Sequence, residues 1–121
     1  TEESIWGNAI LSRYPIIESG QVELPREGAP MGRGFIWAKI EIGAAQPLLV
    51  VVTHLHHIEA DNQIRLAQIP VILDFLDQQA QTVLLGDFNA EPDSEEISLV
   101  YESGLLDAWL KAGQGERHLF R

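Results

Sequence analysis

The sequence contains no cysteine, which excludes disulfide bonds and metal sites built on thiolates. Any metal site must therefore use oxygen or nitrogen ligands. Basic residues are also scarce: 8 Lys and Arg stand against 18 Asp and Glu, and the formal net charge is −10. A charge of this sign repels a phosphate backbone on average, so it argues against broad, non-specific binding of nucleic acid.

Long hydrophobic runs are missing as well. The longest purely apolar run, Leu48 to Val52, is far shorter than the roughly 20 residues of a membrane-spanning helix, so we expect no membrane span. No basic and apolar leader opens the chain, and the sequence leaves the localisation of the protein open. The 121 residues, 45% of them hydrophobic, are enough to form the core of one domain over residues 1–121.

Short apolar segments separated by Gly and Pro make up most of the chain, a pattern typical of an α/β or α+β fold. The apolar and alternating patterns predict strands at residues 8–12, 22–24, 35–42, 48–53 and 82–85. The β-branched run at 48–53 is typical of a central strand, buried on both faces. The strand at 82–85 is expected to be buried too.

Two helices are expected between and after these strands. The first runs from Asp61 to about Gln79, with a kink or a break at Pro70. The second follows a capping box with Asp93 at the N-cap and Glu96 at the third helical position, and a further turn is expected at 105–109. The order strand, helix, strand from 48 to 85 predicts a parallel crossover.

The strongest local pattern is Val83-Leu84-Leu85-Gly86-Asp87-Phe88-Asn89, in which a strand ends on an Asp and, two residues later, an Asn. Strand alternation places Asp87 and Asn89 on one side and Phe88 toward the core. Such a polar pair can orient a water molecule, accept a metal ion and hydrogen-bond a phosphoryl oxygen. A polar turn after a strand explains the same two residues, since both residue types favour turns.

A second buried strand, Val50-Val51-Val52-Thr53-His54-Leu55, ends on a histidine. If the two strands are neighbours, His54 and Asp87 emerge at one rim of one sheet, where ligands bind in open α/β sheets. A structural imidazole in the core is the alternative for His54. Arg33 precedes another strand in a Gly-rich loop and either contacts an anion or is a plain loop residue.

Three histidines close together, His54, His56 and His57, also suggest a His-rich binuclear metallohydrolase. The spacing is poor for that class, because a His-x-His-x-Asp-His motif needs Asp and His where this chain has Ile58 and Glu59. His56 and His57 are otherwise loop residues or line a substrate groove. On the following helix, Arg65 and Gln68 lie one turn apart, which is typical of a solvated or hydrogen-bonding helix surface.

Six segments in order form a set that covers nearly the whole chain. They are Gly7-Asn8-Ala9-Ile10-Leu11-Ser12-Arg13-Tyr14-Pro15-Ile16, Arg33-Gly34-Phe35-Ile36-Trp37-Ala38, Thr53-His54-Leu55, Arg65 with Gln68, Gly86-Asp87-Phe88-Asn89, and Gly104-Leu105-Leu106-Asp107-Ala108-Trp109. Together they resemble motifs of the endonuclease/exonuclease/phosphatase superfamily, which includes pancreatic deoxyribonuclease and the neutral sphingomyelinases. The "G-D-F-N" motif is fairly specific, whereas "T-H-L" is weak alone.

The resemblance implies part of a four-layer α/β sandwich, with mixed sheets and outer helices, and hydrolysis of phosphoesters that depends on Mg²⁺ or Mn²⁺. It assigns catalysis to His54, Asp87 and Asn89, and metal binding to Asp87 and Asn89. His54 would contact a non-bridging oxygen or assist the leaving group. The residues expected to contact the substrate are Asn8, Arg33 and His56.

The chain also departs from the family pattern at both ends. The family's upstream metal-binding Glu has no confident counterpart, since Glu2 and Glu3 lie too close to the start, and the downstream Asp and His motifs are absent. We therefore expect an incomplete domain that is inactive alone and that exposes an apolar sheet face, which favours self-association. A family-like binding or structural module without catalysis is the alternative. The substrate stays open between nucleic acid, a phospholipid and a small phosphodiester, and the charge argues slightly against duplex DNA.

Overall fold

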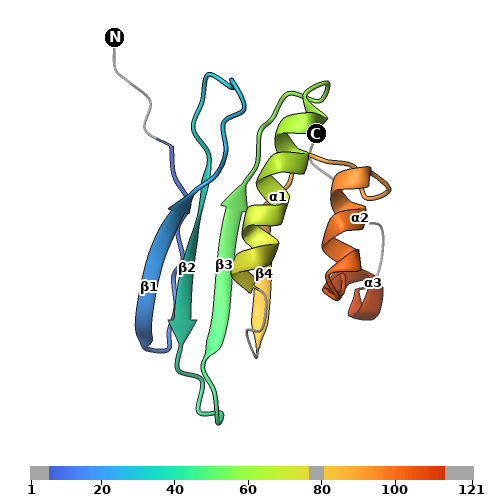
Figure 1. The fold of residues 1–121 in the computed structure, drawn as a ribbon. Helices are drawn as coiled ribbons and strands as arrows, with labels where there is room; N and C mark the ends of the chain where they lie inside the picture. Colours follow the sequence, from blue (N-terminus) through green and yellow to red (C-terminus); the bar gives the residue numbers. More distant parts are fainter. Residues whose placement is uncertain (1–5, 77–80, 114–121) are drawn as a thin grey trace.

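The computed structural model describes residues 6–76 and 81–113. Their strands form one sheet in the order β1-β2-β3-β4 (Figure 1). β2 is antiparallel to both β1 and β3, and β4 is parallel to β3. The mixed sheet and the parallel crossover are as predicted. The elements are β1 (Ile16–Glu23), β2 (Gly34–Ile40), β3 (Leu48–His54), α1 (Asn62–Leu76), β4 (Thr82–Asp87), α2 (Glu95–Glu102) and α3 (Ala108–Ala112).

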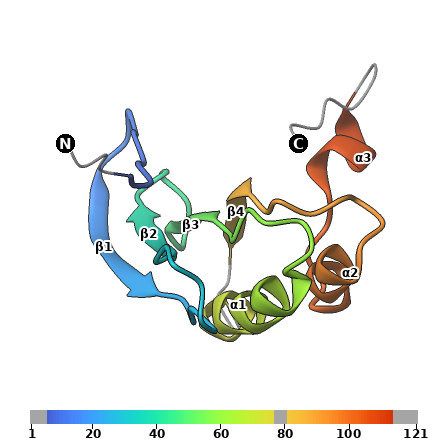
Figure 2. The same ribbon diagram turned by 90° about the horizontal axis from the view of Figure 1, so that it is seen from above.

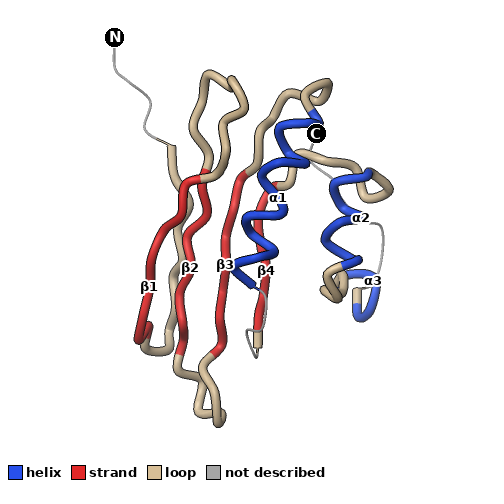
Figure 3. Tube along the Cα trace, in the orientation of Figure 1, coloured by secondary structure: helices blue, strands red, loops and turns tan. Residues whose placement is uncertain are grey.

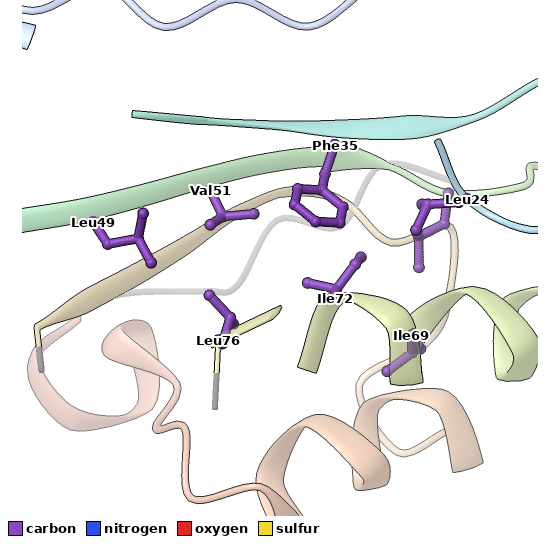
Figure 4. Close-up of a cluster of buried hydrophobic side chains, with 8 residues drawn as sticks. Leu24, Phe35, Leu49, Val51, Ile69, Ile72 and Leu76 are labelled. Carbon is purple, nitrogen blue, oxygen red and sulfur yellow. The ribbon is translucent and has the colours of Figure 1, made fainter. Parts of the chain in front are cut away.

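The main hydrophobic core lies between the sheet and α1, which covers one side of the sheet (Figures 2 and 4). Phe35 and Val51, on neighbouring strands, point to this side and are buried against Ile69 and Ile72 of α1. The helix continues through Pro70 as one element and does not break into two. Pro70 is exposed, and the burial of Ile69 and Ile72 on either side of it outweighs the lost backbone hydrogen bond.

The N-terminal part of the sheet differs from the prediction. Residues 8–12 are not a strand but irregular backbone, drawn as loop in Figure 3, and Ile10 packs against a second buried cluster of Ala38, Ile40 and Val50. The expected weak strand at 22–24 is the end of the longer β1. Most of β1 is exposed at the edge of the sheet, so its sequence lacks the apolar alternation that marks a half-buried strand.

The sheet face opposite α1 is apolar and partly open. On this face β4 contributes Val83 and Leu85, which are 37% and 49% exposed, and β1 contributes the exposed Ile16, the register partner of Ile40. Only the other side of β4, at Leu84, packs against the main core. The prediction that β4 is buried on both faces is therefore wrong. Among the described residues, β4 lies at the edge of the sheet, and helix α1 covers only one of its faces.

The two C-terminal helices begin at polar caps. The N-cap of α2 is Ser94, whose hydroxyl accepts a hydrogen bond from the backbone of Ile97, and not the expected Asp93. Because the helix starts one residue later, Glu96 stands at its second position instead of its third and does not form the expected capping box. Its side chain is buried and accepts a hydrogen bond from Arg65 instead. Asp107 caps α3, which therefore begins three residues later than the turn expected at 105–109. Within the described ranges, no helix combines the length and the apolar character that crossing a membrane would require.

Candidate active site

The candidate site begins at the rim where β3 and β4 end side by side. The parallel register of the two strands pairs His54 with Asp87, and the distance from His54 Nε2 to Asp87 Oδ2 is 3.7 Å. The prediction that these two residues emerge together is therefore correct. Both side chains are at least partly exposed, so a ligand can reach them.

The end of β4 and the turn that follows it explain why Gly86, Asp87 and Asn89 occupy these positions. Gly86 has a φ of 142°, and a Cβ there would lie 1.9 Å from the Thr53 carbonyl oxygen of β3, so only glycine fits. Asn89 has a φ of 48°, in the left-handed region that Asn tolerates better than most residues. Phe88 packs against the main core, as predicted.

Two hydrogen bonds fix the polar groups of this turn. The backbone N–H of Asn89 donates to Asp87 Oδ1 at 2.9 Å, and the Asn89 side-chain nitrogen donates to the Leu55 carbonyl at 2.9 Å. The first bond leaves Asp87 Oδ2 facing His54. The second uses the Asn89 amide nitrogen, so the amide oxygen is the atom available to a ligand.

Arg33 places a positive charge beside this pair. Its Nη2 donates to His57 Nδ1 at 3.2 Å, and its Nε is buried with no partner within the described ranges. Burial lowers the pKa of Arg33, and the charge of Asp87 opposes this shift. From the sequence, His57 is either a loop residue or part of a substrate groove. Its place three positions after His54, the last residue of β3, is the one signal that points to the site.

The environment of His54 favours the neutral imidazole. Burial lowers the pKa of His54 most, the positive charge of Arg33 lowers it further, and the charge of Asp87 raises it without cancelling the two. The exposed ring of Trp6 lies over the same rim, with its centroid 6.4 Å from that of His54. A neutral His54 offers one acceptor and one donor nitrogen to a ligand.

Asn8 lies at the same end of the sheet. Its side-chain amide donates to the Gly34 carbonyl at 3.4 Å, and Gly34 follows Arg33 directly. The hydroxyl of Thr53 donates to the same carbonyl at 3.2 Å. These bonds join the N-terminal segment, the start of β2 and the end of β3 beside the candidate site.

His56 is not at the rim, contrary to its expected role in contacting substrate. It is 1% exposed, its Nε2 donates to Asp61 at 2.9 Å, and its backbone N–H donates to Gln68. Within 6–76 and 81–113, no group of three or more His, Asp or Glu side chains is placed to hold a metal ion. The stretch from His54 to His57 therefore gives no support to a His-rich binuclear centre.

The donor atoms that do meet at the rim are oxygens of Asp87 and Asn89. One carboxylate and one amide oxygen suit a hard cation such as Mg²⁺ or Mn²⁺, which keeps several water ligands and uses one or two carboxylates. These residues supply only part of such a coordination shell. Glu2 and Glu3 lie outside the described residues.

Comparison with known proteins places the chain in a family. The model of the Endonuclease/Exonuclease/phosphatase family matches residues 3–120. An inositol phosphosphingolipids phospholipase C of Schizosaccharomyces pombe is 31% identical over 86% of this chain and 29% of the relative's length.

Solved structures agree on the fold. An endonuclease/exonuclease/phosphatase of Beutenbergia cavernae has a TM-score of 0.70 and 24% identity over 81% of this chain and 30% of its own. The human Nocturnin catalytic domain, solved with a bound sulfate anion, has a TM-score of 0.58 and 22% identity over 71% of this chain and 34% of its own. The expected α+β fold with a mixed sheet is thus confirmed, and this chain spans about a third or less of each of these three proteins.

The family consists of phosphoester hydrolases, among them nucleases, phosphatases and phospholipases. The six ordered sequence motifs, the mixed sheet and the match of the family model over residues 3–120 agree. This chain belongs to the Endonuclease/Exonuclease/phosphatase family.

Proposed function

We propose that the protein carrying this chain is a Mg²⁺- or Mn²⁺-dependent phosphodiesterase in which His54, Asp87 and Asn89 assist the attack of water on phosphorus. The observation that carries this proposal is the pairing of His54 and Asp87 at one rim, 3.7 Å apart, on adjacent parallel strands. When bound by Asp87 and Asn89, the metal ion would supply positive charge to the phosphoryl oxygens.

Asp87 is suited to orient or deprotonate the attacking water. One of its oxygens is fixed by the backbone of Asn89, so the carboxylate has a defined direction, and the other remains open at the rim. Asn89 is held by Leu55 through its nitrogen, and its oxygen can bind the metal ion or the nucleophile. Such fixed groups need little reorganisation during the reaction.

His54 and Arg33 are suited to handle the phosphoryl group. A neutral His54 donates a hydrogen bond to a non-bridging oxygen or assists the leaving group. The guanidinium of Arg33, with its Nε unpartnered within the described ranges, binds an anion bidentately once it turns from His57. Asn8 supports this region through the Gly34 carbonyl beside Arg33.

The preferred substrate in this proposal is a small phosphodiester or a lipid headgroup. The net charge of −10 disfavours a long polyanion such as duplex DNA. The Schizosaccharomyces pombe relative is named as a phospholipase C for inositol phosphosphingolipids, a phosphodiester of this kind.

The test is hydrolysis of bis-p-nitrophenyl phosphate by the full-length protein, with Mg²⁺, with Mn²⁺ and with a chelator. Asp87→Ala should reduce kcat by about 100-fold or more, in the range seen for the loss of one positioned catalytic group. Asp93→Ala, which removes the charge of an exposed Asp outside the site, is the matched control. An unchanged rate in Asp87→Ala, or full activity with the chelator, would contradict the proposal.

A binding or structural module without catalysis is the competing function. It predicts no metal-dependent turnover in the full-length protein.

We also propose that the open sheet face at Val83 and Leu85 makes a chain of these 121 residues self-associate, since exposed apolar patches of this kind favour association.

A further inference from the structure

Arg65 is a charged residue buried on the inner side of α1. It is 2% exposed, and its Nε donates to Glu96 Oε1 of α2 at 2.9 Å. Its remaining nitrogens donate to three backbone carbonyls of the segment that follows β3. These carbonyls belong to His56 at 3.2 Å, Ile58 at 2.6 Å and Glu59 at 2.9 Å.

The same segment, residues 55–59, contacts the candidate site on its other side. The Leu55 carbonyl accepts the hydrogen bond from Asn89, and the Leu55 N–H donates to the Asp87 carbonyl at 3.0 Å. His57 accepts the hydrogen bond from Arg33. Residues 55–59 are therefore held by Arg65 on one side and themselves hold three candidate site residues on the other.

Gln68 adds a second attachment from the same helix. Its Oε1 accepts from the His56 backbone N–H at 3.1 Å, and its Nε2 donates to the Pro25 carbonyl at 3.4 Å. Pro25 lies in the β1–β2 loop that also carries Arg33. Two polar side chains of α1 thus reach both loops that border the site.

We propose that Arg65, held by Glu96, is a positioning residue that fixes residues 55–59 and through them Asn89 and the Arg33–His57 pair. This inference rests on the proposed function, because it assigns Arg65 a role in the same hydrolytic site. A guanidinium is required, since its planar fork reaches one carboxylate and three carbonyls at once. A lysine ammonium is a compact charge that cannot reproduce this geometry.

The test substitutes Arg65→Lys in the full-length protein. A misplacement of about 1 Å is enough to reduce catalysis by up to about 100-fold. We therefore expect kcat to fall by about tenfold or more and KM to rise severalfold. Because Arg65 acts through Asn89, the loss in Arg65→Lys/Asn89→Ala should be clearly smaller than the product of the two single losses.

Two control variants separate positioning from general destabilisation. Ile72→Val removes one core methylene on the same helix and lowers stability, but the Ile72 side chain makes none of the hydrogen bonds that hold the two loops. Glu95→Gln removes a charge from the exposed position next to Glu96. Both variants should keep kcat and KM within about twofold of the wild-type values, as expected for changes outside the site.

Hydrogen exchange gives a readout that needs no activity. The backbone amides of residues 56–61 should exchange at least tenfold faster in Arg65→Lys than in Ile72→Val. Equal exchange in the two variants, or a kcat and KM equal to those of Ile72→Val, would overturn the positioning role. If the wild-type protein is inactive, or if Asp87→Ala hydrolyses the substrate at the wild-type rate, the proposed function is refuted instead. The amide exchange of residues 56–61 then still decides whether Arg65 fixes this segment.

Discussion

Replacing Gly86 by alanine places a methyl group in the contact between β3 and β4. The added Cβ would lie 1.9 Å from the Thr53 carbonyl oxygen, whereas real Cβ atoms stay beyond 3.0 Å, so the strands must separate by about 1 Å. Thr53 is the register partner of Gly86, and the next pair along is His54 and Asp87. The displacement therefore falls directly on the candidate site.

Two contributions set the expected loss of stability for Gly86→Ala. Overpacking costs about 1–3 kcal/mol, and a non-glycine residue at this positive φ costs about 1–3 kcal/mol. We expect the free energy of unfolding to fall by about 3 kcal/mol or more, measured by urea denaturation. A shift of about 1 Å at the site should lower kcat/KM for bis-p-nitrophenyl phosphate by about 100-fold.

Gly104→Ala is the matched control for the backbone strain. Gly104 has a φ of 99°, but a Cβ there would meet nothing within 4 Å. This variant should lose about 1 kcal/mol from strain alone and keep its activity. If Gly86→Ala is as stable and as active as Gly104→Ala, the argument from the close contact of β3 and β4 is wrong.

Three further predictions concern charge and the open face. Arg33→Gln removes a positive charge that lowers the His54 pKa, so in metal-free protein the His54 NMR titration should move to higher pH; a shift to lower pH would contradict the assigned cause. Glu96→Ala leaves the buried Arg65 without its carboxylate and should lower the free energy of unfolding by about 3–5 kcal/mol, against less than about 0.5 kcal/mol for the exposed Glu95→Ala. Leu85→Glu should reduce the concentration-dependent association of the 121-residue chain in light scattering, and an unchanged mass distribution would exclude this face from association.

The central elements of the fold were predictable because burial imposes a clear pattern on their sequences. The β-branched run of β3 reflects its burial. In α1 the pattern is weaker, because the polar Arg65 and Gln68 share its buried side with Ile69 and Ile72. The N-terminal strand was placed wrongly, because residues 8–12 are apolar without forming a strand. The exposed edge strand β1 carries little pattern to detect.

The candidate site was predictable where a side chain follows directly from a strand end. His54 and Asp87 met as expected, because parallel strands bring equivalent ends to one rim. The prediction that His56 contacts the substrate was wrong, because the side chains of a loop have no repeating direction from which its position could be inferred. The inward direction of its ring depends on Asp61 and Gln68, contacts that the sequence alone does not reveal.

The buried side of α1 determines which substitutions this helix tolerates. Arg65 and Gln68 are as deeply buried as Ile69 and Ile72, although two of these four residues are strongly polar. A saturation mutagenesis profile of α1 should therefore show these four positions as almost equally intolerant. The hydrophobicity of the four side chains would not predict the order of their sensitivity to substitution. Sensitivity depends here on how many packing contacts and hydrogen bonds each side chain makes with its neighbours. A library that fills α1 with apolar residues for stability would leave the carbonyls of residues 56, 58 and 59 without their donor.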